Sequence, residues 1–460
     1  MKKVIILFLF ITLCITGASA QQKWALRQCI DYAIENNIEI KQQALQVEGA
    51  GINLNTSKMS RLPNLNASSG SNFNFGQSTI AGTNGYESAN SLNANFSISS
   101  TMPIFTGFRI PNEIKAREFN LLSATANLDK ARENLELQVT SLYLEVLFKK
   151  EILKVYEEQL NLTTMQLEKT RTMVEAGRVP RSQEYDMASQ QAKDELNVTM
   201  SQNDLNLALL NLSQVLNLQE NTSFDIMEPV IEREQISKNK ASLVSPNEIY
   251  QIAIGVKPHV KVAEYDLESN KKKLKVAESA YYPTLSLNAG FGTRYGHLYG
   301  KRTVYDNESD TYYKLPYNNA GLGSQFRNNA SEYIGVTLSI PIFNRFSTRN
   351  SVRMAKLDIN NSMLTLDNVK LALFKEIQQA YQSATAAQSK YTSTEKALQA
   401  AEEAYKYAQD RYDVGKSSVY EFNEAQTKLL SSKSEQIQAK YDFIFRAKIL
   451  DFYRGESIDI

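Results

Sequence analysis

The residue types best suited to catalysis are scarce in this sequence. It contains two histidines, His259 and His297, and two cysteines, Cys14 and Cys29. His259 follows a proline, His297 lies in a segment rich in Tyr, Asn and Gly, and neither has a Ser or Cys partner in a recognisable motif. No spacing of possible ligands matches a metal site. We therefore expect two solvated surface histidines, no cofactor and no enzymatic activity.

A more informative group of polar residues surrounds Gly415. This glycine follows a long helical pattern and fits the left-handed C′ position at which a helix ends. Ser418, with Glu421 three residues later, fits a capping box that starts a new helix. Glu421 lies in the first turn of that helix, where the dipole favours an acid, whereas Glu424, three residues later, has no capping role. A weaker copy of this turn surrounds Gly177.

The two turns belong to a chain that is built twice. Residues from 25 to about 59 and from 246 to about 280 both have helical spacing, and the prolines that follow them, Pro63 and Pro283, are 220 residues apart. The two glycine turns are 238 residues apart, so the second half carries an 18-residue insertion. The excess lies between 295 and about 329. Insertions collect in exposed loops, and we expect this one to face the exterior.

Four segments between the helical regions alternate apolar residues with small polar ones. They cover residues 65–75 and 92–98 in the first half and 285–291 and 334–340 in the second. One face of each is apolar, and the other consists of Asn, Ser, Thr and Gly rather than Lys and Glu. This pattern is typical of strands in an outer-membrane barrel. Two strand pairs are therefore expected, at about 64–102 and about 284–341.

Long helices follow each strand pair. Residues 112–175 contain no glycine or proline, and apolar residues recur every seven positions both there and in 351–412. This is coiled-coil periodicity. Return helices are expected at 182–216 and 418–452, after the turns.

The ends and the middle of the chain complete this plan. Met1-Lys2-Lys3, an apolar run and Ala18-Ser19-Ala20 predict a secretory signal peptide over residues 1–20. The first repeat should then span 21–217, an irregular joining segment 218–245, and the second repeat 246–460. Only Cys29 would remain after cleavage, so no internal disulfide is expected. The charges nearly balance, with 51 basic and 50 acidic residues, and give no sign of nucleic-acid binding.

Four strands are too few to close a barrel around water, and open strand edges are not tolerated in lipid. The smallest membrane barrels have about eight strands, and an open pore needs more. Several chains must therefore contribute. Three would supply twelve strands. The expected fold is a mixed α+β membrane protein in which several chains close one barrel with four strands each, and the helices of the same oligomer form a second tube below it.

The order, spacing and doubling of these segments resemble the TolC family of outer-membrane channel proteins, in its Bacteroidetes-like branch. The resemblance covers nearly the whole chain after the signal peptide, and includes strand exits at Pro103 and Pro341 and the turn from Tyr412 to Gly415. It implies a homotrimer with a twelve-stranded outer-membrane β-barrel, four strands per chain, continued by a long periplasmic α-helical coiled-coil barrel. It also implies the outer-membrane exit duct of a tripartite efflux system, which passively conducts small molecules. The implied partners are a periplasmic adaptor (membrane fusion protein), an inner-membrane transporter of the RND or ABC type, and outer-membrane lipid.

The resemblance also implies roles for residues at the tip. Glu421 and Glu424 match acidic residues that line the closed constriction, and around a three-fold axis they would form rings that select cations. Tyr412 matches a tyrosine that latches neighbouring helices, and Ser182 and Glu184 lie in the matching region of the first turn. From the residues alone, Glu421 is equally a helix cap, and Tyr412 is the last apolar residue of its seam.

Two other functions fit part of the pattern. A type I protein secretion channel would have the same architecture. A trimeric coiled-coil surface adhesin would explain the heptads, but not the four amphipathic strands or the return helices. Ser417 stands where the family often has an arginine, so one latch contact should be absent or replaced.

Overall fold

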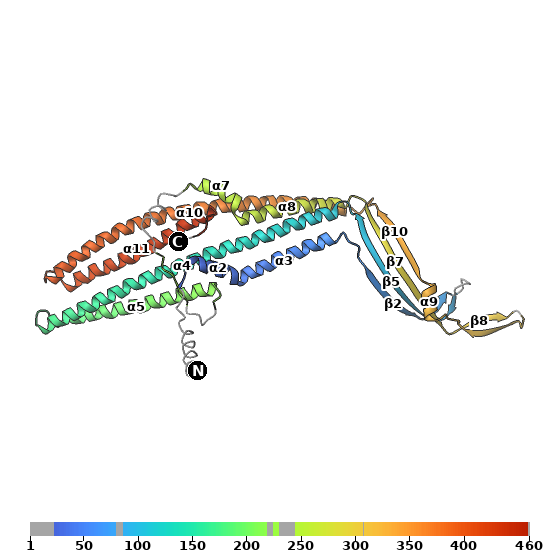
Figure 1. Ribbon diagram of the computed structural model, residues 1–460, viewed down its shortest axis with the longest axis horizontal. Coiled ribbons are helices and arrows are strands. Elements are labelled where there is room, and N and C mark those ends of the chain that lie inside the picture. Colours follow the sequence, from blue (N-terminus) through green and yellow to red (C-terminus); the bar gives the residue numbers. More distant parts are fainter. Residues whose placement is uncertain (1–22, 80–85, 219–223, 230–243, 307, 459–460) are drawn as a thin grey trace, which may run out of the picture. The chain divides into compact units, whose positions relative to one another are not determined.

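The computed structural model describes residues 23–79, 86–218, 224–229, 244–306 and 308–458 (Figure 1). The predicted signal peptide and most of the predicted joining segment lie outside these ranges. The chain divides into two compact units. The helical unit comprises Met1–Glu48, Leu122–Glu264 and Leu364–Ile460, and the sheet unit comprises Gly49–Leu121 and Tyr265–Met363.

The helices of the two halves match in length. They measure 11, 22, 67 and 35 residues in each half, in the same order. The first half has α2 (Leu26–Asn36), α3 (Ile38–Met59), α4 (Arg109–Glu175) and α5 (Arg181–Val215), and the second has α7 (Pro246–Val256), α8 (Pro258–Ser279), α10 (Ser347–Asp413) and α11 (Val419–Tyr453). Within the described ranges, no helix is both long and apolar enough to cross a membrane.

The sequence predicted one continuous helix before each strand pair, and this was wrong. Asn37 is extended, with φ −62° and ψ 132°, because its side chain accepts hydrogen bonds from the next helix, at 2.8 Å from the Glu39 nitrogen and 3.3 Å from the Ile40 nitrogen. In the second half Lys257 is extended, with φ −68° and ψ 125°. It precedes Pro258, whose ring disfavours the helical conformation at the residue before it.

Four antiparallel strands form the main sheet, in the order β10-β7-β5-β2, so that β2 pairs with β5 and β10 with β7. The strands are β2 (Asn66–Asn74), β5 (Asn90–Phe105), β7 (Thr284–Tyr299) and β10 (Ser331–Ser339). Their register aligns the apolar residues on one face and the Asn, Ser, Thr and Gly residues on the other. On the polar face Asn288 accepts a hydrogen bond from Thr101 at 3.0 Å and donates one to Thr337 at 2.9 Å. Hydrogen bonds therefore link the strands across this face.

The insertion in the second half has more structure than the predicted loop. β7 continues to Tyr299, and a hairpin of β8 (Lys301–Asp306) and β9 (Thr311–Pro316) follows, then α9 (Leu322–Asn328). His297 consequently lies in β7 opposite Leu92 and is half-buried, so its placement in a solvated loop was wrong. In the first half a smaller hairpin, β3 (Gln77–Thr79) and β4 (Tyr86–Ser88), joins β2 to β5.

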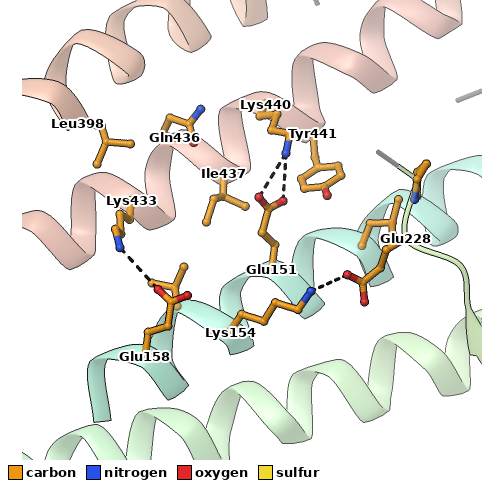
Figure 2. Close-up of a pocket in the computed structure, with 13 residues that line it drawn as sticks. Glu151, Lys154, Glu158, Glu228, Leu398, Lys433, Gln436, Ile437, Lys440 and Tyr441 are labelled. Carbon is orange, nitrogen blue, oxygen red and sulfur yellow. Dashed lines mark hydrogen bonds and ion pairs between the residues drawn. The ribbon is translucent and has the colours of Figure 1, made fainter. Parts of the chain in front are cut away.

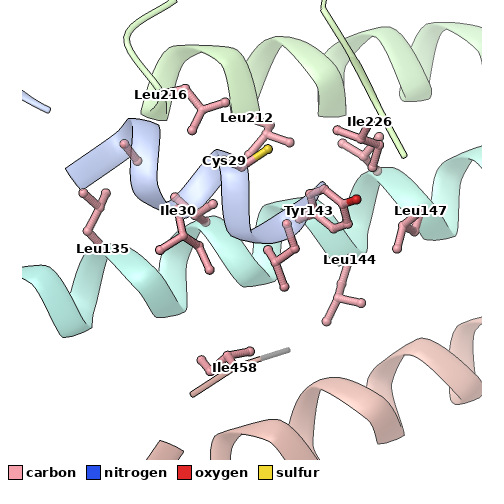
Figure 3. Packing of buried hydrophobic residues seen from close by; sticks show 14 of the residues in the cluster. Cys29, Ile30, Leu135, Tyr143, Leu144, Leu147, Leu212, Leu216, Ile226 and Ile458 are labelled. Carbon is pink, nitrogen blue, oxygen red and sulfur yellow. The ribbon is translucent and has the colours of Figure 1, made fainter. Parts of the chain in front are cut away.

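The main core of the helical unit surrounds α2 (Figure 3). Cys29 is fully buried there and forms no disulfide with any residue in the described ranges, and burial raises the pKa of its thiol to about 12. The Tyr143 hydroxyl donates to the Met227 carbonyl at 2.7 Å and lies 3.2 Å from the Trp24 carbonyl. It thereby anchors two short parallel strands, β1 (Lys23–Trp24) and β6 (Asp225–Ile226), the second of which falls in the segment predicted to be irregular.

His259 is half-buried in the helical unit, and its prediction as a solvated surface residue was wrong. Burial lowers the pKa of its imidazole, and the nearby cations Lys130 and Lys257 lower it further.

Candidate functional site

The two predicted turns end their first helices in the same way. Gly177 and Gly415 have φ of 69° and 71°, the left-handed region that favours glycine. The Gly415 N–H donates to the Tyr412 carbonyl at 3.0 Å, and the Lys416 N–H donates to the Arg411 carbonyl at 2.8 Å. The corresponding bonds of the first turn are both 2.9 Å. This is the Schellman motif, and it fixes where each long helix ends.

Glu421 is half of the predicted capping box. The Glu421 N–H donates to the Ser418 hydroxyl at 3.2 Å, so Ser418 is the N-cap. The return bond to the Ser418 backbone does not form, because the Glu421 carboxylate instead accepts from the Ser417 hydroxyl at 2.6 Å and lies 3.6 Å from the Arg411 guanidinium. Glu424 is exposed and has no polar partner in the described part of the chain. Of the two acids, Glu424 therefore has the freer charge.

Tyr412 packs as a residue of the apolar seam. Its ring stacks on Phe422 with centroids 4.9 Å apart and an interplanar angle of 19°. It covers a small buried cluster formed by Leu167, Met187 and Val419, which come from three different helices. Within one chain, Tyr412 thus holds the two helical hairpins together at the tip. A latch between neighbouring chains stays a prediction.

Polar residues of the first turn make ion pairs. The Arg171 guanidinium lies 3.3 Å from the Glu184 carboxylate within the first hairpin, whereas Ser182 is exposed. A second pair crosses between hairpins: the Lys169 ammonium of α4 lies 2.7 Å from the Asp413 carboxylate of α10. The structure therefore brings the two turns together through Lys169 and Asp413, which the sequence did not identify.

A charge ladder links the same hairpins farther from the tip (Figure 2). The Lys440 ammonium of α11 lies 3.3 Å from the Glu151 carboxylate of α4, and Lys433 lies 3.8 Å from Glu158. The two acids are seven residues apart on one helix, and the two lysines are seven apart on the antiparallel helix. They border a cavity of about 460 Å³ whose apolar lining includes Leu147, Val155, Leu398 and Ile437. Seven-residue spacing of charges was the available sequence signal.

The apolar face of the main sheet is exposed between two groups of aromatic residues. Ile334, Val336 and Leu338 are 78%, 62% and 58% exposed. The loop-side aromatic band consists of Phe73, Phe75, Tyr295, His297 and Tyr299, and the helix-side aromatic band of Phe105, Phe108, Tyr282, Phe343 and Phe346.

The distance between the bands suits a membrane. Leu285 pairs with Phe105 of the helix-side band, and Tyr295 belongs to the loop-side band. Leu285 and Tyr295 are ten residues apart on β7, or roughly 34 Å along an antiparallel strand. At a tilt of about 45° this gives roughly 24 Å, against about 25 Å for the apolar band of outer-membrane barrels. An exposed apolar face bounded in this way is typical of lipid-facing strands.

The model of the family described as outer membrane efflux protein matches two segments, residues 29–218 and 249–450. The chain belongs to the outer membrane efflux protein family. The expected resemblance to TolC and the expected outer-membrane location are confirmed.

Curated relatives of this efflux-family chain match it over most of their length. Outer membrane protein TolC of Escherichia coli is 22% identical over 466 aligned positions, covering 96% of this chain and 84% of that protein. The toluene efflux pump outer membrane protein TtgC of Pseudomonas putida is 22% identical over 463 positions, covering 91% and 82%.

Solved structures share the fold of this efflux-family chain. CusC superposes with a TM-score of 0.75 at 16% identity, covering 95% of this chain and 96% of that one. The outer membrane protein VceC of Vibrio cholerae gives a TM-score of 0.72 at 16% identity, covering 94% and 97%.

Proposed function

We propose that this protein is the outer-membrane exit duct of a tripartite efflux system, in which it passively conducts small molecules that an inner-membrane transporter of the RND or ABC type exports through a periplasmic adaptor. Membership of the outer membrane efflux protein family supports this proposal, as does the relative named as part of a toluene efflux pump. The observation that carries it is the exposed apolar face between two aromatic bands, because such a face belongs in lipid.

A homotrimer closes the barrel in this proposal. β2 and β10 lie at the two edges of the sheet and both have nine residues. Ser331, where β10 begins, pairs with Gly292 of β7, which in turn pairs with Ser97 of β5. Asn74, where β2 ends, pairs with Ser91 of β5. Measured along β5, the two strand ends are therefore staggered by six residues. If β10 of one copy pairs with the whole of β2 of the next, this stagger gives a strand tilt of about 46°.

That tilt lies at the upper end of the roughly 35–45° of membrane barrels. Neighbouring copies would also meet as antiparallel strands, as membrane barrels require. Three copies give twelve strands, enough to leave a pore, and their helices form the periplasmic tunnel.

The tip of the helical unit is the gate in this proposal. Gly177 and Gly415 fix the turns, and Glu421 and Glu424 line the constriction. Because Arg411 offsets the charge of Glu421, Glu424 supplies most of the cation preference. Tyr412, Ser182 and Glu184 contribute to the latch between chains.

Disulfide cross-linking tests the trimeric barrel. Full pairing of β10 with β2 of the next copy places Gly335 opposite Gly70, so Gly70→Cys/Gly335→Cys should give covalent oligomers that end at three chains. Each single variant, and the mismatched pair Asn66→Cys/Gly335→Cys, serves as a control that should stay monomeric in denaturing gels. Cys29 is buried and does not compete. No cross-linking by the matched pair, or a ladder beyond three, would contradict the proposal.

A further inference from the structure

The β8–β9 hairpin stands apart from the main sheet. β8 and β9 form a two-stranded sheet of their own, and every residue of β9 is exposed. Figure 1 shows the hairpin extending past the loop end of the four strands of the sheet unit. An isolated hairpin is at best marginally stable in water. A contacting surface would supply the stability that the hairpin lacks.

Charge is segregated along this hairpin. Lys301, Arg302 and Lys314 lie in the half next to β7, and none of them has an ion pair within the described ranges. Lys314 pairs with Thr303 and Lys301 pairs with Pro316, so the two lysines are diagonal neighbours on one face. Like charges so placed repel each other. An anion between them would remove that cost.

Two of the three acidic residues of the hairpin, Asp306 and Asp310, are used within its turn, and the third, Glu308, lies in the turn itself, at the far end from the lysines. The Asp306 carboxylate accepts hydrogen bonds from the Glu308 N–H at 3.1 Å and from the Ser309 hydroxyl at 2.6 Å. The Asp310 carboxylate accepts from the Tyr305 hydroxyl. These two acids therefore build the turn and do not neutralise the lysines.

Two tyrosines complete the basic face. Tyr305 and Tyr312 are directly opposite each other, with ring centroids 4.9 Å apart, and they share the face of Lys301 and Lys314. The Tyr312 side chain is 74% exposed. These four residues are called the lysine–tyrosine face.

The base of the hairpin is held at the level of the loop-side aromatic band. Lys301 follows Tyr299 of that band by two residues. Beyond the end of β10, side-chain amides occupy the free edge of β7: Gln325 exchanges hydrogen bonds of 2.9 and 2.8 Å with Gly296, and Asn319 exchanges two of 2.9 Å with Leu298. Aromatic bands mark the boundary between lipid tails and headgroups. The lysines consequently lie at headgroup level.

We propose that the lysine–tyrosine face binds the headgroup of a phosphate-bearing glycolipid in the outer leaflet. The two ammonium groups hold the phosphate, and the tyrosine rings pack against the sugar, since aromatic rings combine an apolar face with a polar tip. Charge complementarity selects this occupant, because the free charges on the face are all positive. The inference rests on the proposed placement of the sheet in the outer membrane.

The test measures binding of diphosphorylated lipid A to the purified full-length oligomer in detergent, with enzymatically dephosphorylated lipid A as the second probe. Wild type should bind the phosphorylated lipid at least tenfold more tightly than the dephosphorylated one. Lys301→Gln/Lys314→Gln should bind phosphorylated lipid A at least tenfold more weakly. The matched control Lys396→Gln/Lys406→Gln, which removes two exposed lysines of α10, should bind like wild type.

Equal binding of the two lipids by wild type would overturn the inference without any variant, and so would unchanged binding by Lys301→Gln/Lys314→Gln. Failure of the proposed function looks different: the same preparation would bind lipid A but show no conductance in a planar bilayer. A conducting oligomer that ignores the phosphate overturns only the lipid site.

Discussion

Asn37 and Lys257 interrupt equivalent helices of the two halves, 220 residues apart, with nearly the same backbone conformation: ψ is 132° at Asn37 and 125° at Lys257. Their side chains support the break differently. Asn37 caps the helix that follows it, whereas the Lys257 side chain is 1% exposed and reaches across the helical unit. The two halves thus share the same break between helices, but different side-chain contacts support it in each half.

Removal of the Lys257 side chain should destabilise the helical unit. The Lys257 ammonium lies 3.2 Å from the Glu133 carboxylate and 3.2 Å from the centre of the Phe452 ring. Lys257→Ala should cost about 3 kcal/mol, because it removes a fully buried side chain and leaves the half-buried Glu133 without its partner. Lys257→Met/Glu133→Gln should recover most of this loss. Chemical denaturation at fixed protein concentration measures both, and a double variant as unstable as Lys257→Ala would contradict the explanation.

Acid should loosen the segment around β6. The hydrogen bond from Lys154 lowers the pKa of Glu228 below its ordinary value of 4.5. Burial opposes ionisation of Asp225, but Lys150 and the Ile226 N–H outweigh it, and the net pKa is lowered. A lowered carboxyl pKa stabilises the fold fully above the unfolded value, and this stability is lost as the pH falls through the folded value. Hydrogen exchange at residues 224–229, corrected for intrinsic rates, should therefore rise below about pH 4.5.

Glu228→Gln is the control for this pH effect. It should raise exchange in the same segment at pH 7 and should reduce the further rise in acid. Exchange that is independent of pH in the wild type would show that these ion pairs do not hold the segment.

The two rungs of the charge ladder should differ in strength. The Lys440 and Glu151 side chains are 19% and 34% exposed, whereas those of Lys433 and Glu158 are 36% and 71% exposed. Solvent screening weakens the more exposed pair, Lys433 with Glu158. Double-mutant cycles should therefore give a coupling free energy of about 1 kcal/mol for Lys440 with Glu151 and near zero for Lys433 with Glu158. Equal coupling free energies, or a larger value for Lys433 with Glu158, would contradict this ranking.

Alanine at the turn glycines should be costly for conformational reasons alone. An added Cβ at Gly177 or Gly415 meets nothing within 4 Å, so only the positive φ opposes the substitution. Each Gly→Ala change should cost about 1–2 kcal/mol locally. Gly49→Ala is the matched control: it has equally open space inside α3 and should be neutral or stabilising. Hydrogen exchange at the turns distinguishes these outcomes.

Much of this fold could be predicted because its signals are local and repeated. Seven-residue periodicity predicted the long helices, and alternation of apolar and polar residues predicted the four strands. The glycine that follows each long helical pattern predicted the turns at Gly177 and Gly415. The break at Asn37 was missed because one side chain outweighs the helical pattern around it. β6 has two residues and gives no periodic signal.

The missed parts of the site depend on tertiary contacts. The Lys169–Asp413 pair joins residues 244 apart in sequence. The bond from Ser417 to Glu421 was also missed, since the same sequence equally fits a complete capping box. That a latch contact between chains is absent or replaced at Ser417 stays a prediction.

Single-channel conductance in a planar bilayer tests the proposed channel and its gate together, with wild type compared to Glu421→Ala/Glu424→Ala and to Glu424→Ala alone. We expect a small, cation-selective conductance that rises and loses selectivity in the double variant, with most of the change already present in Glu424→Ala. A large conductance that neither variant alters would place the gate elsewhere, and no conductance from any of the three proteins would contradict the channel itself.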